Sequence, residues 1–147
     1  MDESKKSNSR INLLCGVVAL ICLAMMFVPI GELRGDFNSG WHIVGTMQYA
    51  WGEAVSGFNS QEPIYMIVAL LLTVSAILLA IWAIYSFRGN GKLGLGVSIF
   101  HLLVTAFTTI FLIEGFNGNV TIPVVVANCA LAIVALVLAI LQKKANR

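Results

Sequence analysis

Charged residues are scarce in this chain. Only 11% of its 147 residues are Asp, Glu, Lys or Arg, whereas a soluble domain carries about 25%. Apolar residues make up 59%, and the mean hydropathy is +0.89. A water-soluble protein of this size would lack the polar side chains needed to cover its surface. The composition therefore predicts one domain that lies in a membrane, with the lipid bilayer as its first partner and no nucleic-acid partner.

Cysteine is also rare, and none of it lies in a connecting segment. Cys15, Cys22 and Cys129 all fall inside apolar runs, which argues against a disulfide framework and against a thiol oxidoreductase. Cys15, Cys22 and Met26 share a helical face that could hold Cu(I), but thiols in helices also act as small apolar groups. No Ser or Cys stands near a His and a carboxylate in a triad pattern. We expect no metal, no cofactor and no enzymatic activity.

Four long runs contain no Asp, Glu, Lys or Arg. They predict membrane-spanning helices, because each approaches the roughly 20 residues that a helix needs to cross the hydrocarbon. The first run is long for a signal peptide and lacks a small-residue cleavage site, so we expect it to be retained. Residues 1–10 are polar and are expected to form a flexible tail. The expected spans cover approximately 11–29, 64–87, 93–113 and 120–141.

Short links define the fold class. Residues 88–92 and 114–119 allow the last three spans only to turn back on one another, so these spans are sequential antiparallel neighbours. The sequence therefore predicts an all-α polytopic membrane protein, with residues 1–147 forming a single membrane domain. Its four transmembrane helices form an up-down bundle.

The basic residues predict the orientation. Eight of the nine lie on one side of the expected spans, and only Arg34 lies on the other. By the positive-inside rule the side with the eight is cytoplasmic, so both termini are expected in the cytoplasm and the protein in the cell membrane. The eight are Lys5, Lys6, Arg10, Arg88, Lys92, Lys143, Lys144 and Arg147.

The segment 30–63 is the only long one outside the expected spans. Its apolar residues recur at steps of three and four, which predicts an amphipathic helix over 41–58. Such a helix would lie on the outer leaflet, or it would dock a partner or close over the bundle. The candidate face consists of Trp41, Val44, Met47, Trp51, Val55 and Phe58.

His101 is the one ionisable side chain, cysteines and tyrosines aside, in the expected spans. Thr105 and Thr108 follow it at helical spacing, and Asn128 lies on the fourth span. An intramembrane ionisable residue is a functional candidate, and an imidazole can relay protons or line a polar path. No charged partner is available in any span, so we favour a structural histidine bonded to a threonine or to Asn128.

Small residues mark candidate helix-packing faces, since they let helix backbones approach closely. These faces are expected to pack within the bundle, although part of them could remain for a second protein. The residues are Gly94, Ser98, Ala132, Ala135 and Ala139.

Known families offer only a likeness of layout. One long and one short outer segment resemble the claudin type of four-span protein, but its tryptophan-glycine-leucine-tryptophan signature and paired outer cysteines are absent. Residues 89–94 match G-x-G-x-x-G without the preceding strand that a dinucleotide site requires.

Two functional interpretations follow. The first is a non-enzymatic membrane subunit or interaction protein that stabilises or regulates a larger complex, bound to another membrane protein or to itself. The alternative is a small oligomeric transporter or channel with a path lined by His101 and threonines.

Overall fold

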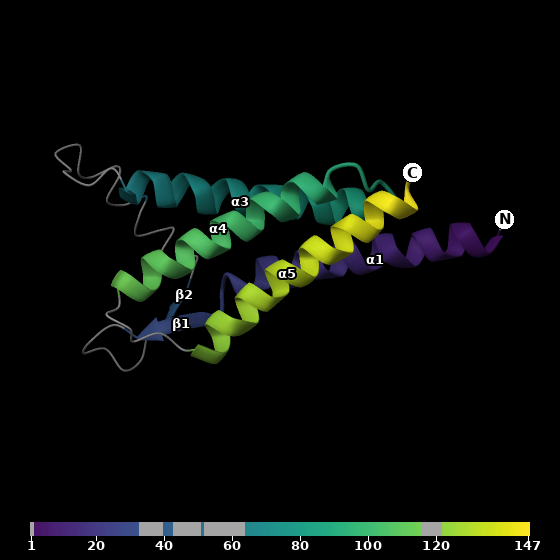
Figure 1. The fold of residues 1–147 in the computed structure, drawn as a ribbon. Coiled ribbons are helices and arrows are strands. Elements are labelled where there is room, and N and C mark those ends of the chain that lie inside the picture. The colour runs from purple at the N-terminus through teal and green to yellow at the C-terminus, as the bar shows by residue number, and fades with distance from the viewer. Residues whose placement is uncertain (1, 33–39, 43–50, 52–63, 116–121) are drawn as a thin grey trace.

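The computed structural model describes residues 2–32, 40–42, 51, 64–115 and 122–147 (Figure 1). Its described part is almost entirely helical, and four helices are long and apolar enough to cross a membrane. These are α1 (Asp2–Met25), α3 (Ile64–Phe87), α4 (Gly94–Gly115) and α5 (Ile122–Ala145). The all-helical prediction and its four long apolar helices are confirmed, and α3 matches its predicted bounds.

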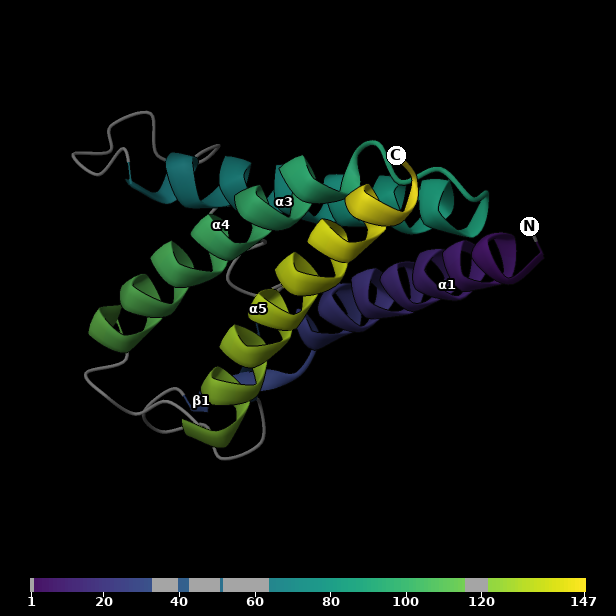
Figure 2. The same cartoon turned by 45° about the vertical axis from the view of Figure 1, so that its right-hand side comes forward.

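The four helices form a ring in which each packs against two others. α1 lies against α3 and α5, and α4 lies against the same two helices from the other side. Consecutive helices run antiparallel, so both termini and the α3–α4 link lie at one end (Figures 1 and 2). We call this the terminal end, and the end with the two strands the strand end. Every Lys and Arg of the described residues lies at or near the terminal end.

The first helix begins earlier than the sequence suggests. Residues 2–10, predicted as a flexible tail, are the first turns of α1. Contacts with the end of α5 hold these turns in place: Asn8 Nδ2 donates to the Ala145 carbonyl at 2.7 Å, and Ile11 packs against the core. The polar residues 2–10 therefore belong to a helix that extends past the apolar region rather than to an unstructured tail.

Glycines shape the link between α3 and α4. Gly89 has a φ of 78°, which an L side chain would strain, and it ends α3 in a Schellman motif. In this motif Gly89 N donates to the Ser86 carbonyl and Asn90 N to the Tyr85 carbonyl, both at 2.9 Å. The Asn90 side chain then accepts from Lys92 N at 3.1 Å. The glycine-rich match in 89–94 is therefore a helix-to-helix turn.

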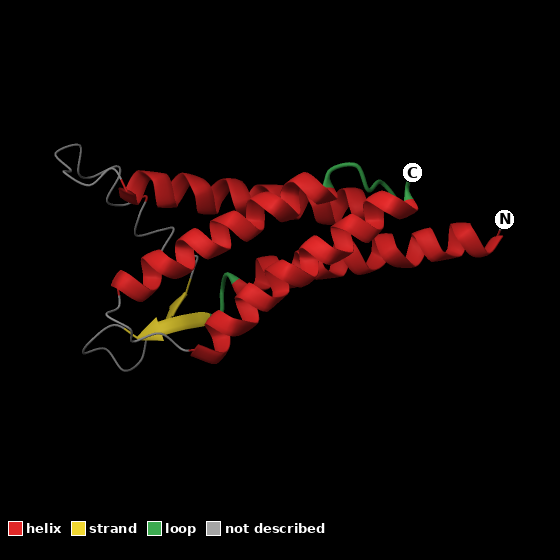
Figure 3. Ribbon diagram, viewed as in Figure 1, coloured by secondary structure: helices red, strands yellow, loops and turns green. Residues whose placement is uncertain are grey.

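Two short strands at the strand end were not predicted. β1 (Pro29–Glu32) pairs antiparallel with β2 (Gly40–His42) through Gly31–Trp41 and Glu32–Gly40 (Figure 3). The predicted helix over 41–58 is therefore wrong at its start, because Trp41 and His42 lie in β2. Backbone pairing with β1 satisfies their polar groups in place of a helical turn. Trp51 is helical, whereas Val44, Met47, Val55 and Phe58 lie outside the described residues.

The core divides into two apolar clusters along the bundle. The cluster nearer the terminal end surrounds Trp82, whose side chain is fully buried. It also contains Cys15, Val18, Ala19, Cys22, Leu79, Ala83, Val97, Ala135 and Ala139. The cluster nearer the strand end contains Met26, Val68, Ala69, Leu72 and Val104.

Candidate functional site

His101 lies buried in the middle of α4 and bonds to two hydroxyl groups. Its Nδ1 lies 3.0 Å from Ser75 Oγ on α3, and its Nε2 lies 3.5 Å from Thr105 Oγ1 one turn further along α4. A neutral imidazole has one donor and one acceptor, and hydroxyl groups can serve either role. Both ring nitrogens can therefore be satisfied in either tautomer. Sequence spacing indicates Thr105, but Ser75 stands on another helix and was missed.

Thr108 and Asn128 extend the polar region toward the strand end. Thr108 lies on the His101 face of α4, is almost fully buried, and its Oγ1 has no hydrogen-bond partner in the described part of the chain. Asn128 is equally buried on α5. Thr109 Oγ1 and Cys129 Sγ are 3.8 Å apart, so antiparallel packing places Thr108 and Asn128 at nearly the same level. The structure records no bond from either of them to His101.

A second polar cluster, which the sequence analysis missed, occupies the terminal end. Gln142 is fully buried there, and its Oε1 accepts from Trp82 Nε1 at 3.0 Å. Its Nε2 donates to Asn12 Oδ1 and to Ser86 Oγ, both at 3.0 Å. Asn146 Nδ2 donates to the same Asn12 oxygen at 3.1 Å. One amide side chain thus joins α1, α3 and α5.

Its position in the sequence hid this cluster. Gln142 follows the last apolar residue of the fourth predicted span, where a polar side chain normally faces water. The one hint in the sequence is the pair Gly91 and Gly94, which the fold places opposite Gln142. A Cβ on Gly94 would lie 2.5 Å from Gln142 Oε1 and 2.6 Å from Trp82 Nε1, so only glycine leaves room for this hydrogen bond.

The small-residue faces pack inside the bundle. Gly94 and Ser98 on α4 face inward, and so do Ala132, Ala135 and Ala139 on α5, which are fully buried. Within the bundle these faces bring α5 close to α1 and α4. Any partner helix must therefore use other, outward-facing surfaces.

The cysteines on α1 face a neighbouring helix. Cys15 Sγ lies 3.4 Å from the Leu138 carbonyl, and Cys22 Sγ lies 3.9 Å from the Leu131 carbonyl. Both thiols therefore point at the backbone of α5, two turns apart. Within the described ranges, no three His, Cys, Asp or Glu side chains gather as a metal site would require.

Trp51, from the chain between β2 and α3, contacts the bundle. Its Nε1 donates to Thr73 Oγ1 at 2.9 Å, and Thr73 in turn donates to the Ala69 carbonyl. The indole packs against the apolar cluster nearer the strand end. Trp51 therefore contacts the bundle itself, which agrees at this residue with the alternative of a segment that closes over the bundle rather than with the outer-leaflet placement. The side chain of Trp41 is not described.

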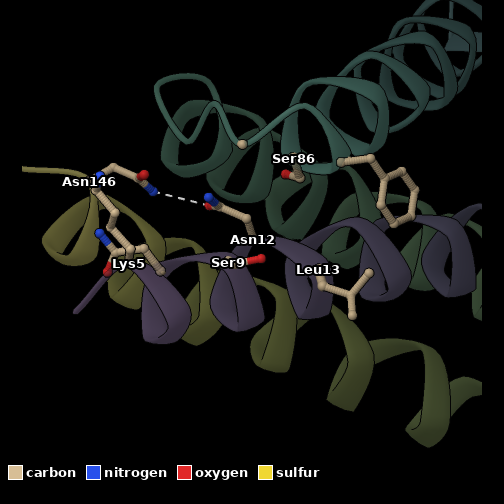
Figure 4. Close-up of a pocket in the computed structure, with 9 residues that line it drawn as sticks. Lys5, Ser9, Asn12, Leu13, Ser86 and Asn146 are labelled. Carbon is tan, nitrogen blue, oxygen red and sulfur yellow. Dashed lines mark hydrogen bonds between the residues drawn. The ribbon is translucent and has the colours of Figure 1, made fainter. Parts of the chain in front are cut away.

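A pocket of about 350 Å³ opens at the terminal end between α1 and the end of α3 (Figure 4). Polar groups from α1, α3 and the residue that follows α5 line one part of it: Lys5, Asn8, Asn12, Ser86 and Asn146. Leu13 and Phe87, which belong to the apolar stretches of α1 and α3, line the other part of the pocket. The pocket thus combines one cation, several amide and hydroxyl groups, and an apolar edge.

Comparison with known proteins yields no relative. No family model matches the chain, and neither a curated protein nor a solved structure matches it.

Proposed function

We propose that this chain is an integral membrane protein with four spans, cytoplasmic termini and a cytoplasmic α3–α4 link, and that it serves as a non-enzymatic subunit of a larger membrane complex. One observation carries the proposal: the described helices fill the bundle interior between mid-bundle and the terminal end. Between the His101 region and the terminal end, Leu79, Trp82 and Val97 pack in one apolar cluster. A bundle filled in this way acts through its outward surfaces.

The outward face of α4 is the best candidate for the partner surface. Gly96 lies there with no atom within 4 Å of the position that a Cβ would take. Glycine costs an exposed helix position about 1 kcal/mol relative to alanine, and no described residue fills the space beside Gly96. Leu103, 64% exposed, lies on the same face two turns away. A notch beside bulky apolar residues suits a closely packed partner helix.

Photo-crosslinking at native expression tests this function. A photoreactive residue at Leu103 should capture one different membrane protein, and one at Ile133 on the outward face of α5 should not. Gly96→Leu should abolish the Leu103 product, because the added side chain fills the notch. Equal capture at both positions, or no effect of Gly96→Leu, would contradict a specific partner on α4.

The polar strip of His101, Thr105 and Thr108 supports a second candidate, an oligomeric transporter. This strip runs from mid-bundle toward the strand end, and the unpartnered Thr108 hydroxyl is a group that a passing solute could use. The transporter predicts a Leu103 product made of two copies of this chain. It also predicts flux through liposomes that hold the purified chain alone, and loss of that flux in Thr105→Val. The subunit function predicts no such flux.

A further inference from the structure

The donors of the terminal-end pocket are fixed by hydrogen bonds behind it. The Trp82 indole N–H can only donate, so Gln142 must turn its oxygen toward Trp82 and its NH₂ group toward Asn12. Asn12 therefore presents Oδ1 to Gln142, and Asn146 donates to the same oxygen. The Asn12 NH₂ group points away from Gln142 and toward Gly89. Its nitrogen lies 4.0 Å from the position that a Cβ on Gly89 would take.

No hydrogen bond from this Asn12 NH₂ group is seen in the described part of the chain, and the group is open to the pocket that Asn12 lines rather than sealed in the core. Ser86 Oγ accepts from Gln142 Nε2, and no acceptor for the Ser86 hydroxyl proton is seen among the described residues. Lys5 lines the same pocket, and no carboxylate of the described residues pairs with its ammonium group. Two neutral donors and one cation thus meet in one cavity, a combination that favours an anion with several acceptor oxygens.

The other wall of the pocket is apolar. Leu13 and Phe87 are 56% and 49% exposed, and both belong to helices long enough to cross a membrane. The Phe87 ring lies across α1 at Gly16, where an added Cβ would meet it at 2.7 Å. A ligand that reaches from the polar wall to the apolar wall must itself be amphipathic. The pocket volume of about 350 Å³ lies within the range of small-molecule sites.

We propose that the terminal-end pocket binds the phosphate headgroup of an anionic glycerophospholipid. Lys5 and the Asn12 NH₂ group hold the phosphate oxygens, the Ser86 hydroxyl group supplies a further donor, and the acyl chains lie along Leu13 and Phe87. The location suits this ligand, because the pocket sits where the helices would leave the hydrocarbon for the headgroup layer. The proposal rests on the four-span placement above and adds a specific lipid to it.

Lipid titration of the purified full chain in detergent, followed by native mass spectrometry, tests the proposal. Phosphatidylglycerol should bind more tightly than phosphatidylcholine. Lys5→Gln should weaken phosphatidylglycerol binding about fivefold, the effect of one basic residue near an anionic headgroup. Lys6→Gln is the matched control, since Lys6 stands one residue away outside the pocket, and it should change binding less than about twofold. Asn12→Asp keeps the oxygen that Gln142 and Asn146 need but replaces the NH₂ group, so it should also weaken binding.

Three results would overturn the proposal. Equal binding of both lipids would remove the preference for an anionic headgroup. Equal effects of Lys5→Gln and Lys6→Gln would indicate general surface attraction. Displacement of phosphatidylglycerol by inorganic phosphate at the same affinity would assign the pocket to the free anion. Thermal unfolding of Asn12→Asp shows whether the variant is folded, and the Lys5 variant gives the answer if it is not. Membrane topology, measured separately, distinguishes failure of this site from failure of the four-span placement.

Discussion

At the scale of the residue, the buried hydrogen bonds of Gln142 predict that its replacement lowers the stability of the fold. Gln142→Leu removes three hydrogen bonds of 3.0 Å. It leaves Trp82 Nε1 and Ser86 Oγ without these partners and Asn12 Oδ1 with Asn146 alone. Hydrogen bonds between membrane helices average about 0.6 kcal/mol each, so the free energy of unfolding should fall by about 2 kcal/mol. Unfolding in mixed detergent and dodecyl sulfate micelles measures this loss. Leu141→Ala, on the outward face beside it, is the control, and an equal loss in both variants would refute a structural role of the cluster.

His101 should behave as a packing residue. His101→Gln keeps a donor and an acceptor, and it should preserve stability and any cellular phenotype. His101→Leu leaves Ser75 and Thr105 without their imidazole partner, and it should cost only about 0.6 kcal/mol per lost bond. A double-mutant cycle with Ser75→Ala measures the coupling in the same micelles. Complete loss of phenotype in the glutamine variant, with stability intact, would favour proton handling instead.

At this scale the sequence predicts contacts within a helix better than contacts between helices. The spacing of His101 and Thr105 places both on one face of any helix, whatever its surroundings. The hydrogen bond to Ser75 depends on the rotation of α3 about its axis, and the inward position of Gln142 needs the room that Gly91 and Gly94 leave opposite it. Asn128, considered as a partner of His101, has no bond to it in the structure. These features arise from packing between segments far apart in the chain.

Two glycines give the sharpest prediction at the scale of the element. Gly94 and Gly96 are two residues apart on α4, but one faces the bundle and the other faces outward. Gly94→Leu should disrupt the terminal end and cost several kcal/mol, because its side chain has no space beside Gln142 and Trp82. Gly96→Leu should leave the fold intact and raise helix propensity. Thermal unfolding and gel filtration of the two variants make the comparison, and equal stability would contradict the packing of α4.

Elements were predictable where a long uncharged run had no competing signal. α3 begins and ends where its apolar run does, and the ends of α4 and α5 lie near those expected. The start of α1 and the β1–β2 pair were missed for a common reason. In both places tertiary contacts decide the structure. α5 contacts the polar first turns of α1, and Trp41 lies in a strand because its backbone pairs with Gly31 of β1. A local apolar period contains no information about such contacts.

At the scale of the whole molecule, the four-helix ring and the distribution of basic residues both support the proposed four-span placement. Among the described residues, basic side chains occur in three separate stretches of sequence, and the fold brings all three to the terminal end. Folding of a soluble bundle does not require this segregation, whereas the positive-inside rule does. The same end holds the Gln142 cluster and the proposed lipid pocket.

Accessibility of the α3–α4 link tests the four-span placement most directly. A single cysteine at Asn90, with Cys15, Cys22 and Cys129 changed to alanine, should react with a membrane-impermeant maleimide only after the cells are permeabilised. A cysteine at Ser7 should behave alike, and one at Asn117, between α4 and α5 in the sequence, should react in intact cells. Labelling at Asn90 in intact cells would contradict the placement on which both proposals depend.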